Sequence, residues 1–154
     1  MAIVTALQKQ ISQTPTITAG AYAAGDALGG LLTFEGATRQ ENLTALLLGV
    51  TILDLAKQDA QFDLVLFNQT FTPTTDNAAF DPTDADLAHV IGHVQIAAAD
   101  YADFNDSSIA TVTGVNLPIH VTGSVNLYGQ LVNRSTPTYA TTSDLTVILY
   151  LMQD

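Results

Sequence analysis

Apolar and polar residues alternate most regularly between positions 49 and 68. In residues 50–55 and 62–67, Ile, Leu, Val and Phe alternate with Thr and Asp at a period of two. This period is typical of a β-strand with one buried face. A short polar segment rich in Ala, Lys, Gln and Asp separates the two runs, so the pattern predicts an antiparallel hairpin.

Stretches of the same kind recur along the rest of the chain, separated by turn residues. The further predicted strands are residues 43–49 (continuing into 50–55), 93–97, 109–113, 117–121, 126–133 and 145–151, with two more between residues 14 and 34 around a turn at Gly25-Asp26. Gly29-Gly30 inside one of them predicts a bulge. Eight or nine short strands and one short helix predict an all-β fold, an antiparallel β-sandwich or jelly roll of about eight strands.

No repeat or linker divides the chain. We expect a single sandwich domain over residues 14–154, preceded at residues 1–13 by an N-terminal arm or an edge strand. Residues 1–10 lack the basic-then-apolar order of a secretory signal. The longest apolar stretch, residues 45–50, is far shorter than the roughly 20 residues that a membrane-spanning helix needs.

Asp76, Asp81, Asp84 and Asp86 lie close together in a segment of irregular sequence. Calcium loops of the EF-hand type need a glycine and a final glutamate at fixed spacing, and this segment has neither. Asp81 is a good N-cap, Pro82 suits the first helical position, and Asp84 and Asp86 suit a first turn. The pattern therefore favours a short capped helix over a metal site.

The charge balance restricts the class of partner. Four basic residues against fifteen acidic ones give a formal net charge of −11. Nucleic-acid binding needs a basic patch, and the four basic side chains form no cluster in the sequence. An anionic membrane surface is disfavoured for the same reason. The chain has no cysteine, so neither disulfides nor thiol chemistry contribute.

Candidate catalytic residues are sparse. His89 and His93 have helical spacing, but the zinc-protease motif needs Glu after the first His, and Val90 stands there. His120 lies in a separate predicted strand. No nucleophile elbow or phosphate loop is present. We therefore expect no enzyme, no catalytic or metal site and no cofactor.

Three stretches carry a family resemblance: TPTITAGAYAAGDALGGLLTF, VTILDLAKQDAQFDLVLFNQTFTPTTDNAAFDPTDADLAHVIG and LYGQLVNRSTPTYATTSDLTVILYLMQD. Together they resemble the capsid decoration (cement) proteins of tailed bacteriophages. The resemblance implies a non-enzymatic virion protein on the outer capsid surface, made in the host bacterial cytoplasm. It also implies a homotrimer at three-fold or quasi-three-fold positions, with the major capsid protein as partner and no nucleic acid or membrane bound.

Two regions are candidates for the partner interface. Apolar residues in the arm predict contacts with the capsid or a neighbouring subunit, and aromatic residues in two long loops predict exposed subunit contacts. These residues are Ile3, Val4, Leu7, Ile11, Phe71, Phe80 and Tyr139. A head-fibre or tail-associated module and a carbohydrate-binding β-sandwich domain are the alternative functions.

Overall fold

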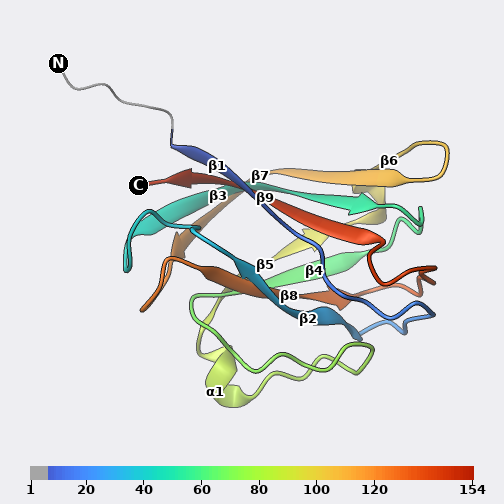
Figure 1. The fold of residues 1–154 in the computed structure, drawn as a ribbon, viewed down its shortest axis with the longest axis horizontal. Helices are drawn as coiled ribbons and strands as arrows, with labels where there is room; N and C mark the ends of the chain where they lie inside the picture. Colours follow the sequence, from blue (N-terminus) through green and yellow to red (C-terminus); the bar gives the residue numbers. More distant parts are fainter. Residues whose placement is uncertain (1–6) are drawn as a thin grey trace.

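Two antiparallel sheets lie face to face in the computed structural model, which describes residues 7–154 (Figure 1). The five-stranded sheet has the order β1 (Gln8–Gln13), β9 (Leu145–Gln153), β3 (Thr44–Asp54), β7 (Ser108–His120) and β6 (Tyr101–Asp103). The four-stranded sheet has the order β2 (Ala27–Phe34), β8 (Leu127–Asn133), β4 (Phe62–Phe67) and β5 (Val90–Ile96). Two single turns of helix, α1 (Asp84–Leu87) and η1 (Ala98–Asp100), complete the described elements.

This strand order is that of a jelly roll. Apart from the short β6, each sheet holds four strands, in the orders β1-β9-β3-β7 and β2-β8-β4-β5. Neighbours in a sheet are mostly distant in sequence, because the chain crosses repeatedly between the two sheets, as jelly-roll connectivity requires. The predicted all-β sandwich is therefore confirmed.

The predicted hairpin between residues 50–55 and 62–67 is wrong. β3 pairs with β7 and β9, whereas β4 pairs with β5 and β8 in the other sheet. The Asp54 carboxylate accepts hydrogen bonds from the backbone N–H groups of Ala56, Gln58 and Asp59 at 2.8–3.1 Å. Because these bonds wind the loop around Asp54, the chain turns away from β3 and enters the opposite sheet.

Three smaller expectations also change. Residues 109–113 and 117–121 belong to one strand, β7, which continues through Gly114 and Asn116 at φ of 67° and 50°. Residues 14–24 form no strand. The backbone N–H groups of Ile17 and Tyr22 each donate one isolated hydrogen bond to the loop before β9. The helix cap is Thr83 and not Asp81, because the Thr83 hydroxyl accepts the N–H of Asp86.

Other local predictions are confirmed. Asp84 and Asp86 lie in the first turn of α1. The β2–β8 register shifts between Leu28 and Leu32, around the predicted Gly29-Gly30 bulge. Gly29 has a φ of +66°, and a Cβ there would lie 2.6 Å from the Pro15 side chain, so only glycine fits.

The core lies between the two sheets. Every second residue of most strands points its side chain into it. Its largest fully buried aliphatic and aromatic members include Phe34, Phe62, Leu47, Ile52, Leu64, Ile96 and Ile119. Alternation along each strand then sends the intervening side chains to the two outer faces. None of the helices in residues 7–154 is both long and apolar enough to cross a membrane.

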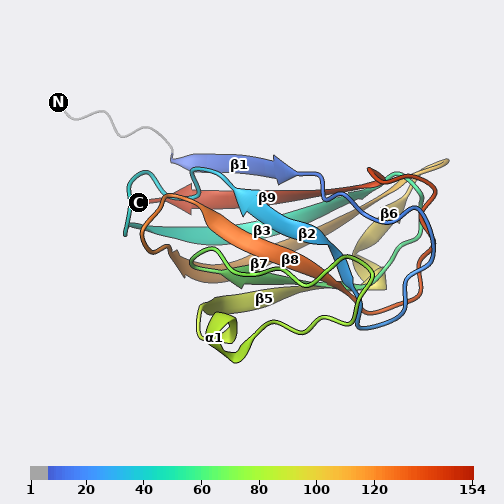
Figure 2. The ribbon, with the colours of Figure 1, turned by 60° about the horizontal axis from the view of Figure 1, so that its bottom comes forward.

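The chain covers the outer face of its four-stranded sheet with its own loop. The buried Gln130 amide of β8 bonds to both backbone groups of Thr74, and Phe71 stacks on Phe67 of β4 with ring centroids 3.7 Å apart. Figures 1 and 2 both show this loop and α1 on the side of β8 away from β1. The loop that contains Phe71 and Thr74 thus covers this part of the four-stranded sheet's outer face.

Candidate functional site

The opposite face, the outer side of the five-stranded sheet, is the candidate site. Register and alternation place on it the side chains of Gln8, Gln10 and Ser12 from β1, Thr146, Ile148, Tyr150 and Met152 from β9, Leu46, Leu48, Thr51 and Leu53 from β3, and Ile109, Thr111 and Thr113 from β7. We call this set the bare face, because no loop of residues 7–154 packs over it as Thr74 packs over Gln130.

No residue of this set is charged, and the Asp154 carboxylate, which accepts a hydrogen bond from Thr44 at 3.3 Å, lies at the end of the face beside Leu46 and Met152. The solvent side of an antiparallel sheet is normally polar. Here aliphatic residues occupy the middle of β3 and β9, and Met152 at its end is 51% exposed. In a chain of net charge −11, a face without charge is a distinct surface.

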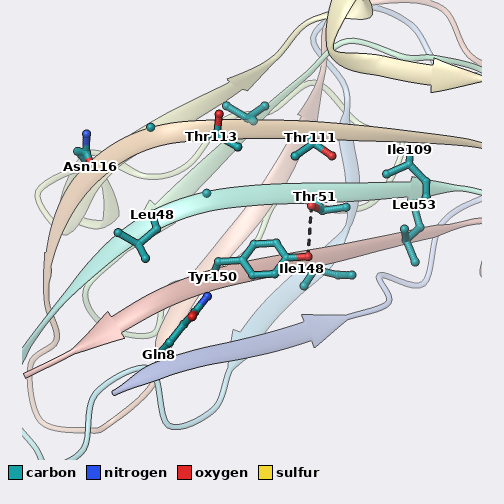
Figure 3. A pocket seen from close by; sticks show the side chains of 13 residues that line it. Gln8, Leu48, Thr51, Leu53, Ile109, Thr111, Thr113, Asn116, Ile148 and Tyr150 are labelled. Atoms are coloured by element: carbon teal, nitrogen blue, oxygen red, sulfur yellow. Dashed lines mark hydrogen bonds between the residues drawn. The ribbon is translucent and has the colours of Figure 1, made fainter. Parts of the chain in front are cut away.

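A shallow groove of about 670 Å³ runs along this face between β1 and β7. Leu48, Leu53, Ile109 and Ile148 supply apolar walls (Figure 3). Around them lie uncharged polar groups from Gln8, Thr51, Thr111, Thr113, Asn116 and Tyr150. The groove can therefore bury apolar groups and form neutral hydrogen bonds, but it offers no ion pair.

A bulge in β3 shapes the groove. The pairing of β3 with both β7 and β9 shifts between Leu47 and Gly49, so that Leu48 and Gly49 both line the groove. A Cβ at Gly49 would lie 2.8 Å from the backbone oxygen of Val112. The close approach of β3 and β7 at this point thus depends on glycine.

Gly49→Ala is expected to lower the free energy of unfolding by about 1–3 kcal/mol, because the strands must separate to admit the methyl group. Urea unfolding measures the loss. Gly30→Ala is the matched control, since a Cβ at Gly30 in β2 meets nothing within 4 Å. Equal stability of the two variants would contradict this account of the bulge.

The acidic residues singled out in the sequence lie away from the bare face. Asp76, Asp81, Asp84 and Asp86 belong to the loop and helix on the four-stranded side. Asp76 accepts hydrogen bonds from Thr18, Tyr22 and Gly29, so its carboxylate serves the fold. Within residues 7–154, no three His, Cys, Asp or Glu side chains are grouped to hold a metal ion.

The predicted interface residues do not form one site. Ile3 and Val4 lie outside the described residues. Leu7 is half-buried just before β1, and Ile11 in β1 packs into the core at 8% exposure. Phe80 is half-buried in the loop over the four-stranded sheet.

The expectation of exposed loop aromatics is wrong for Phe71 and Tyr139. Phe71 is 6% exposed because it stacks on Phe67, and Tyr139 is 2% exposed because it packs edge-on against Tyr22. The two ring contacts hold their loops against the sandwich. Burial also raises the pKa of the Tyr139 hydroxyl. Aromatic content in a loop therefore does not by itself indicate exposure.

The bare face did have a signal in the sequence. Residues 147–152, VILYLM, and residues 45–50, ALLLGV, are apolar at successive positions, not at every second one. Such continuous runs are typical of strands buried on both faces. β9 and β3 are these strands, and the described chain covers only one of their two sides.

No protein-family model matches the chain, and no curated protein matches its sequence. A crystal structure of the infectious bursal disease virus VP2 subviral particle is 9% identical, over 94% of this chain and 32% of that one, with a TM-score of 0.34.

A structure of infectious bursal disease virus, Gx strain, is 10% identical over 94% of this chain and 37% of that one, with a TM-score of 0.33. This chain thus spans about a third of each of these viral chains. At such TM-scores the backbones diverge too far for any functional conclusion to follow.

Proposed function

We propose that the chain is a non-enzymatic structural protein of a virion, which decorates and stabilises the outer surface of a tailed-phage capsid. The observation that carries this proposal is the bare face: an uncharged, partly apolar sheet surface on a chain of net charge −11. The resemblance to phage decoration proteins supplies the class of partner.

The two sides of the sandwich suit attachment by one face. An apolar surface of this kind on a folded domain marks an interaction site. Docking the bare face on the shell buries its aliphatic side chains, while the acidic loop over the four-stranded sheet stays in water. Binding that is specific for the assembled lattice stabilises that lattice by mass action.

The finer points of the proposal follow the resemblance. The partner is the major capsid protein, and the chain binds as a homotrimer at three-fold or quasi-three-fold positions after synthesis in the host bacterial cytoplasm. Light scattering after size exclusion tests the trimer, and a monomer both in solution and on the capsid contradicts it.

Thr113→Asp is expected to weaken capsid binding at least tenfold. Thr113 is exposed at the groove, and a short carboxylate buried there would lose its hydration without gaining an ionic partner. Co-sedimentation with expanded tailed-phage capsids measures binding. Thermal unfolding checks that the variant is folded.

Thr72→Asp is the matched control. Thr72 is also exposed but lies in the loop over the four-stranded sheet, so the variant makes the same change of charge on the opposite side. Equal binding by the two variants contradicts docking by the bare face. Failure of the unmodified chain to sediment with capsids contradicts the capsid as partner, and sedimentation with phage tails instead would favour the tail-associated alternative.

Carbohydrate binding is the second candidate, favoured by one observation. Tyr150 lies in the groove beside Gln8, with Asn116 across from it, and sugar sites combine an aromatic ring with amide groups (Figure 3). The neighbouring side chains of Leu48, Leu53 and Ile148 offer sugar hydroxyls no partner, so this candidate ranks second. Binding to a glycan array, abolished by Tyr150→Ala, would reverse the ranking.

A further inference from the structure

Strand β1 lies along one rim of the five-stranded sheet and has an open edge (Figure 2). It pairs only with β9, in an unbroken register over all six of its residues. Just before β1, the carbonyl of Leu7 accepts the N–H of Gln153 on the β9 side. Because backbone groups alternate in direction along an antiparallel strand, those of Gln8, Gln10 and Ser12 point away from β9. No backbone hydrogen bond within residues 7–154 reaches that side of β1.

The other sheet edges of residues 7–154 carry features that hinder the addition of a further strand. β6 is only three residues long. Beyond β6, the free side of β7 contains Pro118 and two residues with positive φ, Gly114 and Asn116. In the four-stranded sheet, a register shift interrupts the pairing of both edge strands, β2 and β5. Short edges, proline and bulges are means by which native sheets prevent edge-to-edge association, and β1 has none of these three.

Charge is a further means of protecting an edge, and Lys9 is the one charged residue of β1. Its side chain is half-buried, and its Nζ lies against Gly36 in the loop that follows β2. The ammonium group therefore packs on its own chain. The exposed side chains of the strand, those of Gln8, Gln10 and Ser12, are uncharged. In a chain of net charge −11, β1 is thus an edge strand without an acidic residue.

The open edge is complementary to itself. When two copies of β1 lie antiparallel with Gln10 opposite Gln10, Gln8 of each copy faces Ser12 of the other. Each of these three residue pairs then exchanges two hydrogen bonds through the outward N–H and C=O groups. At the intervening positions, Lys9 faces Ile11 of the second copy, so no like charges stand opposite each other. This register satisfies every outward backbone group of the strand.

We propose that β1 binds β1 of a second copy of this chain, which joins two five-stranded sheets into one continuous sheet about a two-fold axis. The axis is perpendicular to the sheet, because Gln10 faces its own counterpart within the sheet plane. Both bare faces therefore lie on the same side of the joined sheet. The proposal concerns the free chain, and it depends neither on a capsid partner nor on the three-fold contact of the proposed function.

The absence of native cysteine allows disulfides to test this register. Opposed residues of a hydrogen-bonded antiparallel pair have Cα atoms about 5.5 Å apart, which is within the span of a disulfide. Gln10→Cys in the full chain is therefore expected to form a covalent dimer under mild oxidation. Ser12→Cys is the matched control on the same strand and face, because the two copies of Ser12 lie four residues apart along the paired strands, or about 14 Å.

We expect non-reducing electrophoresis to show the disulfide-linked dimer at least tenfold faster for Gln10→Cys than for Ser12→Cys. In a mixture of Gln8→Cys and Ser12→Cys chains, the mixed dimer should form faster than either homodimer, because the register places Gln8 opposite Ser12. Intact mass spectrometry distinguishes these dimers, since the two substitutions change the mass differently. Equal rates for Gln10→Cys and Ser12→Cys, no dimer in any variant, or no preference for the mixed dimer would each overturn the proposal.

Gln10→Pro tests the backbone pairing without cysteine. The proline ring removes the outward N–H at the centre of the pair, while the hydrogen bonds of Lys9 and Ile11 to β9 remain. Sedimentation equilibrium is expected to show the dissociation constant of the dimer raised at least tenfold by Gln10→Pro and less than threefold by Gln10→Ala, which keeps the N–H. Equal constants for the two variants, or an unmodified chain that stays monomeric at about 1 mM, would contradict strand pairing at β1. These measurements use the purified chain alone, so their outcome is separate from that of the capsid-binding test.

Discussion

Gln130→Ala is expected to lower the free energy of unfolding by about 3 kcal/mol, since removal of a buried hydrogen-bonding group leaves its partners unsatisfied. The Gln130 side chain is 0% exposed. Its Nε2 donates to the carbonyls of Gly29 and Thr74 at 2.8 and 2.6 Å, and its Oε1 accepts the N–H of Thr74 at 3.0 Å. One amide thus joins β8, the bulge of β2 and the covering loop.

Urea unfolding measures this effect, and the melting temperature should fall by roughly 6–12 °C, at 2–4 °C per kcal/mol for a domain of this size. Gln95→Ala is the matched control. Gln95 lies in β5 of the same sheet but is exposed, so its loss should change stability by less than about 0.5 kcal/mol. Similar losses in both variants would show that the Gln130 bonds do not hold the loop.

Asp76→Ala should cost a comparable free energy, about 3 kcal/mol, because hydrogen bonds to a charged group are the stronger kind. The Asp76 carboxylate accepts the Thr18 hydroxyl at 2.6 Å, the Tyr22 hydroxyl at 2.7 Å and the N–H of Gly29 at 2.6 Å. Asp81→Ala removes the same charge from an exposed position of the same loop. If the two variants unfold at the same urea concentration, the three hydrogen bonds to Asp76 add no stability, and only the loss of one negative charge is measured.

A spectroscopic readout accompanies this second prediction. Burial, and then the hydrogen bond to Asp76, raise the pKa of Tyr22 to about 12 from its ordinary value of 10.0. The folded state keeps the phenolic proton where the unfolded chain loses it, so the Tyr22 contribution to stability is complete below pH 10 and is lost as the pH rises towards 12. In Asp76→Ala, the ultraviolet titration of Tyr22 should move to lower pH.

The sequence predicted the kind of structure better than its connections. Period-two alternation located β4 and β8 closely, apolar runs located β3 and β9, and Gly29-Gly30 located the bulge, because these signals depend on local sequence. The partner of each strand depends on contacts between residues far apart in the chain. The pattern around residues 56–61 looked like a hairpin turn, whereas the three hydrogen bonds to Asp54 direct the chain into the other sheet.

The sequence indicated the candidate site only in part, through the continuous apolar runs of residues 45–50 and 147–152, for a related reason. Alternation shows that a strand has two faces, but it does not show which face another part of the chain covers. Phe71 and Tyr139 were expected to be exposed, yet both pack against aromatic neighbours. The extent of the bare face became visible when the register placed Thr51 between Thr111 and Ile148 on adjacent strands.

The position of β9 has a consequence for biosynthesis. β9 is the last strand to be synthesised among those of residues 7–154, and it lies inside the five-stranded sheet, between β1 and β3. While the protein is being translated, β1 has no strand beside it and one edge of β3 is open until the ribosome has passed residue 153. Because distant pairings form slowly and open edges invite association, the nascent chain should complete this sheet only once residues 145–153 have left the ribosome, and until then chaperones that bind extended apolar segments should bind it.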